Sequence, residues 1–228
     1  MAFATKRARV LNIALGSALV GLAFAAAGTV RWPAFWVLLG VYAGGLGGLM
    51  SWLKRRNPGL LKERIAGATR PGVKAWDKRI LRAYTVLLAV MLLVAPLDAV
   101  RFRWSRVPIG VQGLALLGLL AAGGLLMGVF RANAFLAEYV RIQEDRGHAV
   151  CTTGPYRIVR HPMYVAIIAT VFCVPVLLGS LYALIPAGLI TGLFVLRTAL
   201  EDRTLQAELP GYAEYARNVR WKLIPGVW

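Results

Sequence analysis

Acidic residues are scarce in this chain of 228 residues, in which 10 Asp and Glu oppose 27 Lys and Arg and the formal net charge is +17. Cysteine and histidine are scarcer still, with two residues of each. They are Cys151, Cys173, His148 and His161, and their spacing matches neither a metal-binding motif nor a disulfide framework. We therefore expect no metal site in this protein.

Charged residues of both signs make up only 16% of the chain, whereas 58% is hydrophobic and the mean hydropathy is +0.62. A soluble domain of this length could not bury so much apolar surface. A bilayer core roughly 30 Å thick needs about 20 apolar residues per helix. Suitable apolar runs lie at about 10–30, 33–53, 80–100, 107–130 and 162–196. The composition thus predicts an all-α polytopic membrane bundle.

The first and last apolar runs need interpretation. The first, 10–30, follows basic residues as a signal peptide would, but about 20 apolar residues exceed the usual signal core of 7–15, so we expect a retained helix. The last, 162–196, is too long for one crossing, and we interpret it as helices over 162–178 and 181–200 joined by a tight turn. The total is six crossings, or five if the last run is partly re-entrant.

Positive charge is distributed asymmetrically along the chain. If the N-terminus is inside, all but four of the 27 Lys and Arg residues lie inside; the four are Arg31, Arg101, Arg103 and Arg106. This pattern predicts cytoplasmic N- and C-termini, and we expect a bacterial inner membrane. The basic loop 54–79 would attract anionic lipid headgroups. The asymmetry argues against a nucleic acid as the partner of this basic protein.

The residues that could carry chemistry concentrate in the second half. We interpret residues 1–106 as a transmembrane scaffold of three helices with the basic loop, and residues 107–228 as the functional core. A helical pattern continues beyond the fourth apolar run, because apolar residues from Phe135 to Ile142 recur at i, i+4 and i+7. We therefore predict one helix over about 108–146 that projects from the membrane.

The densest polar cluster lies between the fourth and fifth apolar runs. Gly154-Pro155 predicts a turn, because Pro155 fixes its own φ angle and restricts the residue before it. Pro162 suits the first turn of a helix, which places His161 near the N-cap and Arg160 just outside it. Backbone N–H groups, the helix dipole and Arg160 would then face one way, an arrangement that binds anions such as carboxylates.

Two tyrosines, Tyr156 and Tyr164, accompany this cluster. One interpretation is a basic interfacial anchor with the tyrosines in the headgroup belt. The other is a functional site, because polar groups at the mouth of a membrane bundle are costly to place.

A second polar cluster follows the last apolar run. Arg197, Glu201 and Leu205 are spaced by four and share one helical face, with Asp202 beside them. A local Arg197–Glu201 salt bridge is one interpretation. The other is a charged floor for a polar ligand that lies between this helix and the 154–164 segment.

These clusters together resemble the isoprenylcysteine carboxyl methyltransferase family, integral membrane enzymes that use S-adenosylmethionine; the phospholipid methyltransferases are more distant relatives. The matching pieces are Gly154-Pro155-Tyr156, Arg160-His161-Pro162-x-Tyr164, Glu201-Asp202 followed by Leu205, Tyr212-x-x-Tyr215 and Ile224-Pro225-Gly226. The resemblance covers about residues 107–228, and its strength comes from five short fragments in one order. The chain departs from the family at Asp202, where a second glutamate is usual, and at Cys151, where an aliphatic residue is more frequent.

The resemblance implies an S-adenosylmethionine pocket on the cytosolic side, formed by the C-terminal half of the chain. The residues that would bind the cofactor are Gly154, Pro155, Tyr156, Arg160, His161, Pro162, Tyr164, Glu201 and Asp202. The catalytic residues would be Arg197, which faces the methyl acceptor, and Glu201. A gap between helices would admit a small apolar or prenylated acceptor from the bilayer.

Methyl transfer from a sulfonium is a direct displacement that needs the nucleophile, the methyl group and the sulfur in line, at roughly 3–3.5 Å. Carboxyl O-methylation is the expected reaction, with Arg197 binding the acceptor carboxylate through two hydrogen bonds. The ring of Tyr156 or Tyr164 could stabilise the sulfonium. An amine acceptor would instead need a general base, for which Glu201 and His161 are the candidates.

Three other functions stay open on the sequence alone. The first is a lipid N-methyltransferase. The second is a nicotinamide-dependent lipid reductase of related layout, which no G-x-G-x-x-G segment supports. The third is a non-enzymatic membrane protein, such as a transporter or an assembly partner. A transporter would place polar groups near the bilayer midplane, whereas the polar clusters here lie at one face.

Overall fold

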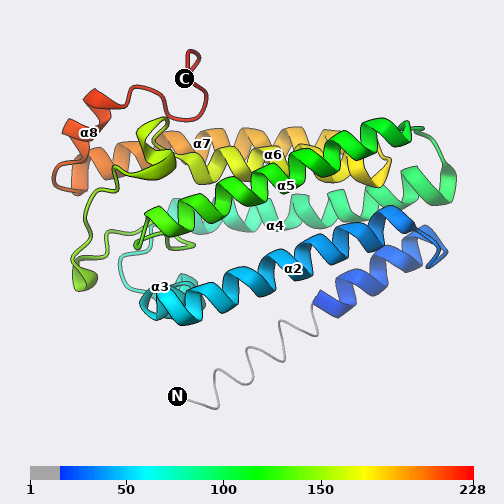
Figure 1. Cartoon of the computed structure of the whole chain (residues 1–228), viewed down its shortest axis with the longest axis horizontal. Helices are drawn as coiled ribbons and strands as arrows, with labels where there is room; N and C mark the ends of the chain where they lie inside the picture. Colours follow the sequence, from blue (N-terminus) through cyan, green and yellow to red (C-terminus); the bar gives the residue numbers. More distant parts are fainter. Residues whose placement is uncertain (1–15) are drawn as a thin grey trace.

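The computed structural model describes residues 16–228, and the described chain consists of helices and connections without a β-strand (Figure 1). The start of the first apolar run and the basic residues before it lie outside this range. The helices are Gly16–Ala27, α2 (Pro33–Arg56), α3 (Pro58–Ala66), α4 (Ala75–Pro96), α5 (Ile109–Ala132), α6 (Pro162–Leu178), α7 (Leu184–Glu208) and α8 (Tyr212–Asn218). The predicted all-α class is confirmed for the described residues.

Four helices in the described range are long and apolar enough to cross a membrane. They are α2, α4 with its π-helical continuation to Phe102, α5 and α7. The helix Gly16–Ala27 and α6 are apolar but shorter than 18 residues. The structure therefore supports an integral membrane bundle with four candidate spans, and the count of five or six crossings stays a prediction.

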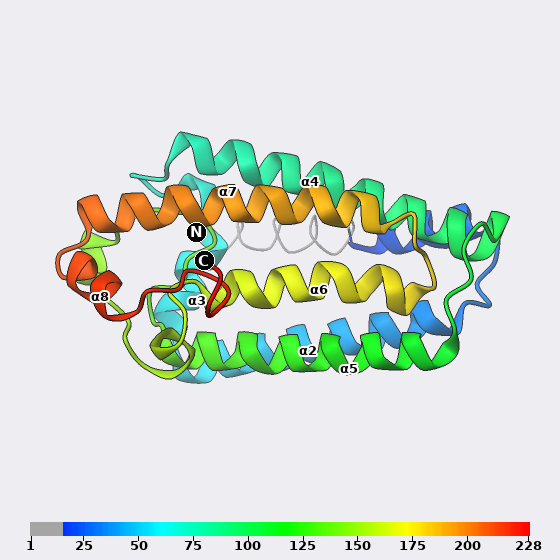
Figure 2. The same cartoon turned by 90° about the horizontal axis from the view of Figure 1, so that it is seen from above.

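The last apolar run folds as the predicted hairpin. Helix α6 begins at Pro162 and ends at Leu178, where Gly179 adopts a φ angle of 87° that favours glycine. Helix α7 begins at Leu184 and continues to Glu208, beyond the predicted crossing 181–200. Helix α6 packs between α5 and α7, and α4 packs along α7 (Figure 2). The hairpin thus brings the two polar clusters to the same end of the bundle.

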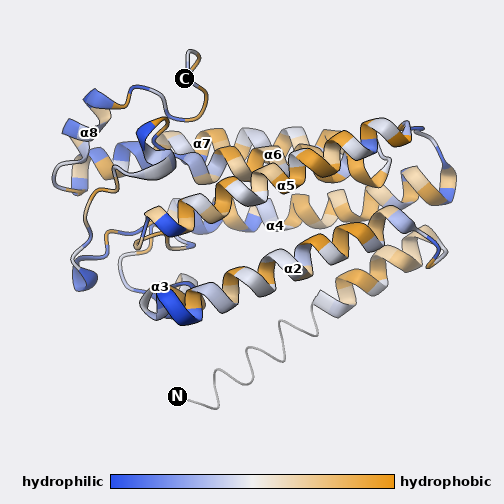
Figure 3. Cartoon of the chain, viewed as in Figure 1, coloured by the Kyte–Doolittle hydropathy of each residue, from blue (hydrophilic) through white to orange (hydrophobic). Residues whose placement is uncertain are grey.

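The two ends of the bundle differ in character. The helices are apolar along their middle parts, and hydrophilic residues gather at both ends, most of all around α3, α8 and the connection after α5 (Figure 3). At the opposite end, the buried carboxylate of Asp98 accepts hydrogen bonds from Ser105 (Oγ, 2.8 Å), Ser180 (Oγ, 2.6 Å) and the backbone N–H of Tyr182 (3.1 Å). Asp98 therefore joins the segment after α4 to the turn between α6 and α7 at this end of the bundle. The two polar clusters lie at the other end.

The predicted helix over 108–146 is wrong, because α5 ends at Ala132. Asn133 ends it: its side-chain Oδ1 accepts the backbone N–H of Phe135 at 2.8 Å, in place of a bond within a helix. Residues 133–160 then cross the end of the bundle as an irregular connection with two short 3-10 turns, Glu144–Arg146 and Gly154–Arg157.

Distant side chains satisfy the backbone of this connection. Arg64 Nη1 donates to the carbonyl of Leu136 at 3.0 Å, and Arg197 Nη2 donates to that of Glu138 at 2.7 Å. The backbone N–H of Val140 donates to Asp77 Oδ2 at 2.8 Å. Buried backbone groups need such partners, and these partners replace the helical bonds that local periodicity had suggested.

Candidate functional site

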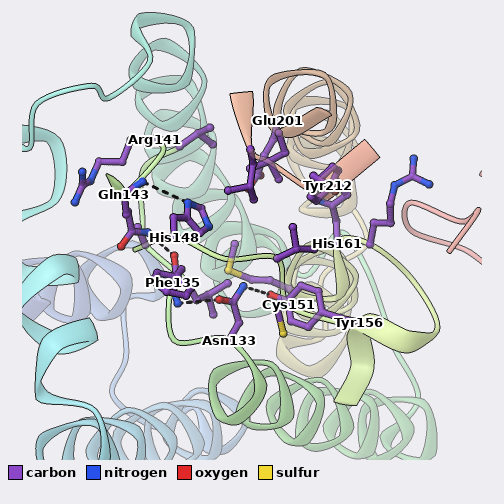
Figure 4. Close-up of a pocket in the computed structure, with 18 of the residues that line it drawn as sticks. Asn133, Phe135, Arg141, Gln143, His148, Cys151, Tyr156, His161, Glu201 and Tyr212 are labelled. Carbon is purple, nitrogen blue, oxygen red and sulfur yellow. Dashed lines mark hydrogen bonds between the residues drawn. The ribbon is translucent and has the colours of Figure 1, made fainter. Parts of the chain in front are cut away.

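A pocket lies at the end of the bundle where the connection 133–160 covers α6 and α7 (Figure 4). The empty space within it, counted together with its open mouth, is about 760 Å³. Side chains from the connection lie on one side of it, opposite Glu201, His161 and Tyr212. The site therefore combines the two polar clusters with a third segment.

The structure brings most of the predicted site residues together. Those that line the pocket are Tyr156, Arg160, His161, Tyr164, Arg197 and Glu201. Those that do not are Gly154, Pro155, Pro162 and Asp202. The residues of the second group lie outside the pocket lining and position residues of the first group.

Gly154 and Pro155 seat the connection against α5. Gly154 has a φ angle of 57°, and a Cβ atom there would lie 3.2 Å from Cβ of Ala132. Pro155 lies close to Gly128 of α5, where an added Cβ would lie 3.5 Å from its Cγ atom. The tight turn predicted at this dipeptide holds the neighbouring Tyr156, whose hydroxyl accepts a hydrogen bond from Asn133 Nδ2 at 2.9 Å.

The start of α6 has the predicted arrangement, with Pro162 in the first turn and His161 at the N-cap. Its nearby N–H groups are not free, however. The N–H of Arg160 donates to the carbonyl of Trp221, and that of His161 donates to the carbonyl of Lys222, both at 2.9 Å. The segment after α8 therefore closes this side of the site.

The predicted anion site at Arg160 holds a carboxylate of the chain itself. Arg160 Nε and Nη2 donate to the two oxygens of Asp202 at 2.7 and 3.0 Å, and both side chains are buried. Its remaining nitrogen, Nη1, donates to the carbonyls of Val219 (2.7 Å) and Arg220 (2.8 Å). Of the five N–H groups of Arg160, only the second one of Nη2 has no acceptor in the described chain, so most of the guanidinium is occupied and joins α7 to the C-terminal segment.

Asp202 is similarly committed. Besides Arg160, it accepts hydrogen bonds from Tyr212 Oη (3.1 Å) and Gln206 Nε2 (2.8 Å), and its Oδ1 lies 3.2 Å from His161 Nε2. A carboxylate with these partners has little capacity for a cofactor. Its position behind His161 indicates that it orients that ring.

Glu201 points into the pocket and keeps bonding capacity. One oxygen accepts a hydrogen bond from the hydroxyl of Tyr164, and the other has no hydrogen-bond partner within residues 16–228. The rings of Tyr164 and His161 are parallel, with centroids 5.8 Å apart. Glu201 is thus positioned by α6 and is half-buried at the pocket wall.

Arg197 pairs across the bundle and not with Glu201, so the structure gives no support to the local helical salt bridge. Its Nε and Nη2 donate to the two oxygens of Asp77 at 2.7 and 3.1 Å. The guanidinium lies 5.3 Å from the ring centroid of Tyr164. In the described chain, Nη1 is the only side-chain nitrogen of Arg197 without a hydrogen bond. In this conformation Arg197 therefore cannot bind a substrate carboxylate through two of its nitrogens.

Sequence reasoning missed the contribution of the connection 133–151. Its pocket-lining side chains include Asn133, Phe135, Arg141, Gln143, His148 and Cys151. The available signal was the mixture of polar and aromatic residues over 133–151, most of which the periodicity assigns to a helix that projects from the membrane.

His148 is the titratable ring on this side of the pocket. Its Nδ1 accepts the backbone N–H of Gln143 at 3.3 Å, and its ring packs on Phe135 with centroids 4.8 Å apart. Burial, followed by the charges of Arg141 and Arg146, lowers the pKa of His148 from 6.5 to about 4. His148 is therefore neutral at pH 7.

Within residues 16–228, no group of three or more His, Cys, Asp or Glu side chains is arranged to hold a metal ion. No curated protein matches the chain in sequence. Residues 114–207, however, match the family model of the isoprenylcysteine carboxyl methyltransferase (ICMT) family, and this range contains α6, most of α5 and α7, and the pocket connection between them. The match covers the segment that builds most of the pocket, and over these residues the chain is similar to the isoprenylcysteine carboxyl methyltransferase family.

Proposed function

We propose that this protein is an S-adenosylmethionine-dependent membrane methyltransferase that methylates the carboxylate of a lipidic or prenylated acceptor. The observation that carries the proposal is a pocket with polar and aromatic lining at the mouth of an apolar bundle, most of it built by the segment that matches a methyltransferase family. A polar cofactor could enter from the aqueous end, and a greasy acceptor from between the helices.

The residues present fit a cofactor with a cationic head and hydrogen-bonding groups. Glu201 offers a carboxylate oxygen that has no partner in the described chain, suited to an ammonium or to hydroxyls. Tyr156 offers an aromatic ring, which attracts cations, whereas the ring of Tyr164 already carries the guanidinium of Arg197. His148 is neutral and adds no repulsion to a sulfonium. Asp202 and Arg160 would act indirectly, by fixing His161.

When bound, S-adenosylmethionine supplies an electrophilic methyl group that a carboxylate oxygen can accept without a covalent enzyme intermediate. The chain itself must align the acceptor and exclude water. Nη1 of Arg197 can donate a single charge-assisted hydrogen bond to the acceptor carboxylate, because Asp77 holds the rest of the guanidinium. No general base is needed for a carboxylate, and none is assigned.

The first test measures the thermal unfolding of the purified full chain with and without S-adenosylhomocysteine. At 100 times its dissociation constant the ligand should stabilise the wild type by about 2.7 kcal/mol. Glu201→Gln should lose most of this stabilisation, because it removes the carboxylate at the pocket wall. Glu208→Gln, an exposed carboxylate on the same helix that pairs with Lys74, is the matched control and should keep it.

Transfer is then measured with radiolabelled S-adenosylmethionine and a prenylated cysteine that has a free carboxylate, against the same compound as an amide. Carboxyl O-methylation is supported if the compound with the free carboxylate becomes labelled, the amide does not, and base releases the label. A wild type that binds neither S-adenosylhomocysteine nor S-adenosylmethionine would contradict the proposed function.

A further inference from the structure

The segment between α2 and α4, in the N-terminal half of the chain, contacts the connection that covers the pocket. Arg64 donates to the carbonyl of Leu136, and Glu63 forms a buried ion pair with Arg141 at 2.6 Å. The backbone N–H of Lys74 donates to the carbonyl of Val140 at 3.1 Å. These bonds fix the connection that covers the pocket, so the N-terminal half does more than support the bundle.

Asp77, in the first turn of α4, makes the most direct of these contacts. It is fully buried, and its two oxygens receive three hydrogen bonds: two from Arg197, and one from the backbone N–H of Val140 at 2.8 Å. One carboxylate thus fixes both a pocket-lining guanidinium on α7 and the connection opposite to it.

The charge of this carboxylate matters as much as its bonds. Arg197 lines the pocket, is 3% exposed and lies against the ring of Tyr164. Without Asp77 its positive charge would be poorly screened, because buried charges act over longer distances than exposed ones. The proposed cofactor carries a positive sulfonium, so an uncompensated Arg197 would repel it.

We propose that Asp77 is a positioning residue that neutralises Arg197 and thereby makes the pocket selective for a sulfonium cofactor; the inference rests on the proposed function. Asp77 itself does not line the pocket. It acts through Arg197, whose Nη1 it leaves without a hydrogen bond in the described chain, and through Val140 in the pocket connection.

The test compares the affinities of the full-length protein for S-adenosylmethionine and S-adenosylhomocysteine, which differ by one methyl group and one positive charge. Asp77→Asn should weaken S-adenosylmethionine binding roughly tenfold relative to S-adenosylhomocysteine, as expected for two charges within about 10 Å at an effective dielectric of 20. A purely structural role would weaken both ligands equally, and an unchanged ratio would overturn the proposal.

Two further variants keep the test decisive if Asp77→Asn folds poorly. Arg197→Gln leaves the carboxylate uncompensated and should shift the ratio in the opposite direction, in favour of S-adenosylmethionine. The double variant Asp77→Asn/Arg197→Gln should return the ratio to the wild-type value; a ratio that stays shifted would contradict the inference.

Asp98→Asn is the matched control, because Asp98 is an equally buried and hydrogen-bonded carboxylate at the opposite end of the bundle. Its loss should leave the affinity ratio unchanged, and a shift as large as that of Asp77→Asn would overturn the proposal. Failure of the wild type to bind either ligand would instead refute the proposed function itself.

Discussion

At the scale of single residues, the site separates side chains that are fully occupied from those that keep free bonding capacity. Arg160 and Asp202 satisfy each other and neighbouring groups, so they shape the wall. Glu201 and His148 retain an unpaired atom toward the pocket within the described chain. Substitutions in the first group should therefore reduce stability, and those in the second should reduce binding.

His148 should make the stability of the protein depend on pH. Its pKa is about 4 in the folded state and 6.5 in the unfolded chain, so the unfolded state binds more protons between these values. The stability is therefore fully present above about pH 6.5 and is lost as the pH falls toward 4. After a discount for solvent screening we expect a loss of about 1 kcal/mol by pH 5.

The measurement is thermal unfolding of the wild type and of His148→Gln between pH 7.5 and 5. The wild type should lose more stability than the variant over this range, because glutamine keeps a hydrogen-bond acceptor but cannot titrate. Parallel profiles for the two proteins would show that His148 is not the responsible group.

At the scale of elements, α5 and α6 owe their close packing to a missing side chain. An added Cβ at Gly118 would lie 2.8 Å from Sγ of Cys173, closer than atoms normally approach. Gly118→Ala should therefore destabilise the protein by about 1–3 kcal/mol, as overpacking does. Gly124→Ala, on the same helix with no atom within 4 Å of an added Cβ, should be neutral or slightly stabilising.

Thermal unfolding of both variants checks this expectation. The double variant Gly118→Ala/Cys173→Ala removes the opposing sulfur and should recover most of the lost stability. A Gly118→Ala protein as stable as Gly124→Ala would show that the two helices can separate without cost.

The elements also show which structural features were predictable from the sequence. The α6–α7 hairpin was predicted because its signals are local: Pro162 begins one helix and Gly179 ends it. The connection after α5 was not predicted, because Asp77 and Arg197, far away in the sequence, decide its backbone bonds. Hydrophobic periodicity cannot detect such partners.

The same reason limited the site prediction. The motif residues Tyr156, Arg160, His161 and Tyr164 line the pocket together, because they lie close together in the sequence, whereas Pro162 does not line it. The pairing of their charges was not foreseen: Arg160 was expected to bind a ligand, yet its partner Asp202 comes from α7, 42 residues later. The proposed roles of the individual residues stay predictions.

At the scale of the whole molecule, the pocket lies at one end of the bundle and Asp98 lies at the other. Within residues 16–228, the basic residues other than Arg31, Arg101, Arg103 and Arg106 belong to elements and connections at the pocket end. The positive-inside rule then predicts that the site faces the cytoplasm. The residues 101–106 should lie on the other side of the membrane.

Labelling of single cysteines in intact cells tests this orientation. In a background with Cys151→Ala and Cys173→Ala, the exposed positions Thr152 and Arg106 are each changed to cysteine. A membrane-impermeant thiol reagent should label Arg106→Cys directly and Thr152→Cys only after the cells are opened. Immediate labelling of Thr152→Cys would reverse the predicted orientation.

The pairing of Asp77 with Arg197 also has a consequence in time. The two residues are separated by 120 positions, and ribosomes add about 5–20 residues per second. During synthesis, Arg197 is therefore added roughly 6 to 24 seconds after Asp77. During that interval the carboxylate of Asp77 lacks its partner Arg197. We therefore expect α4 to reach its final depth in the membrane and its final packing only after α7 has been synthesised.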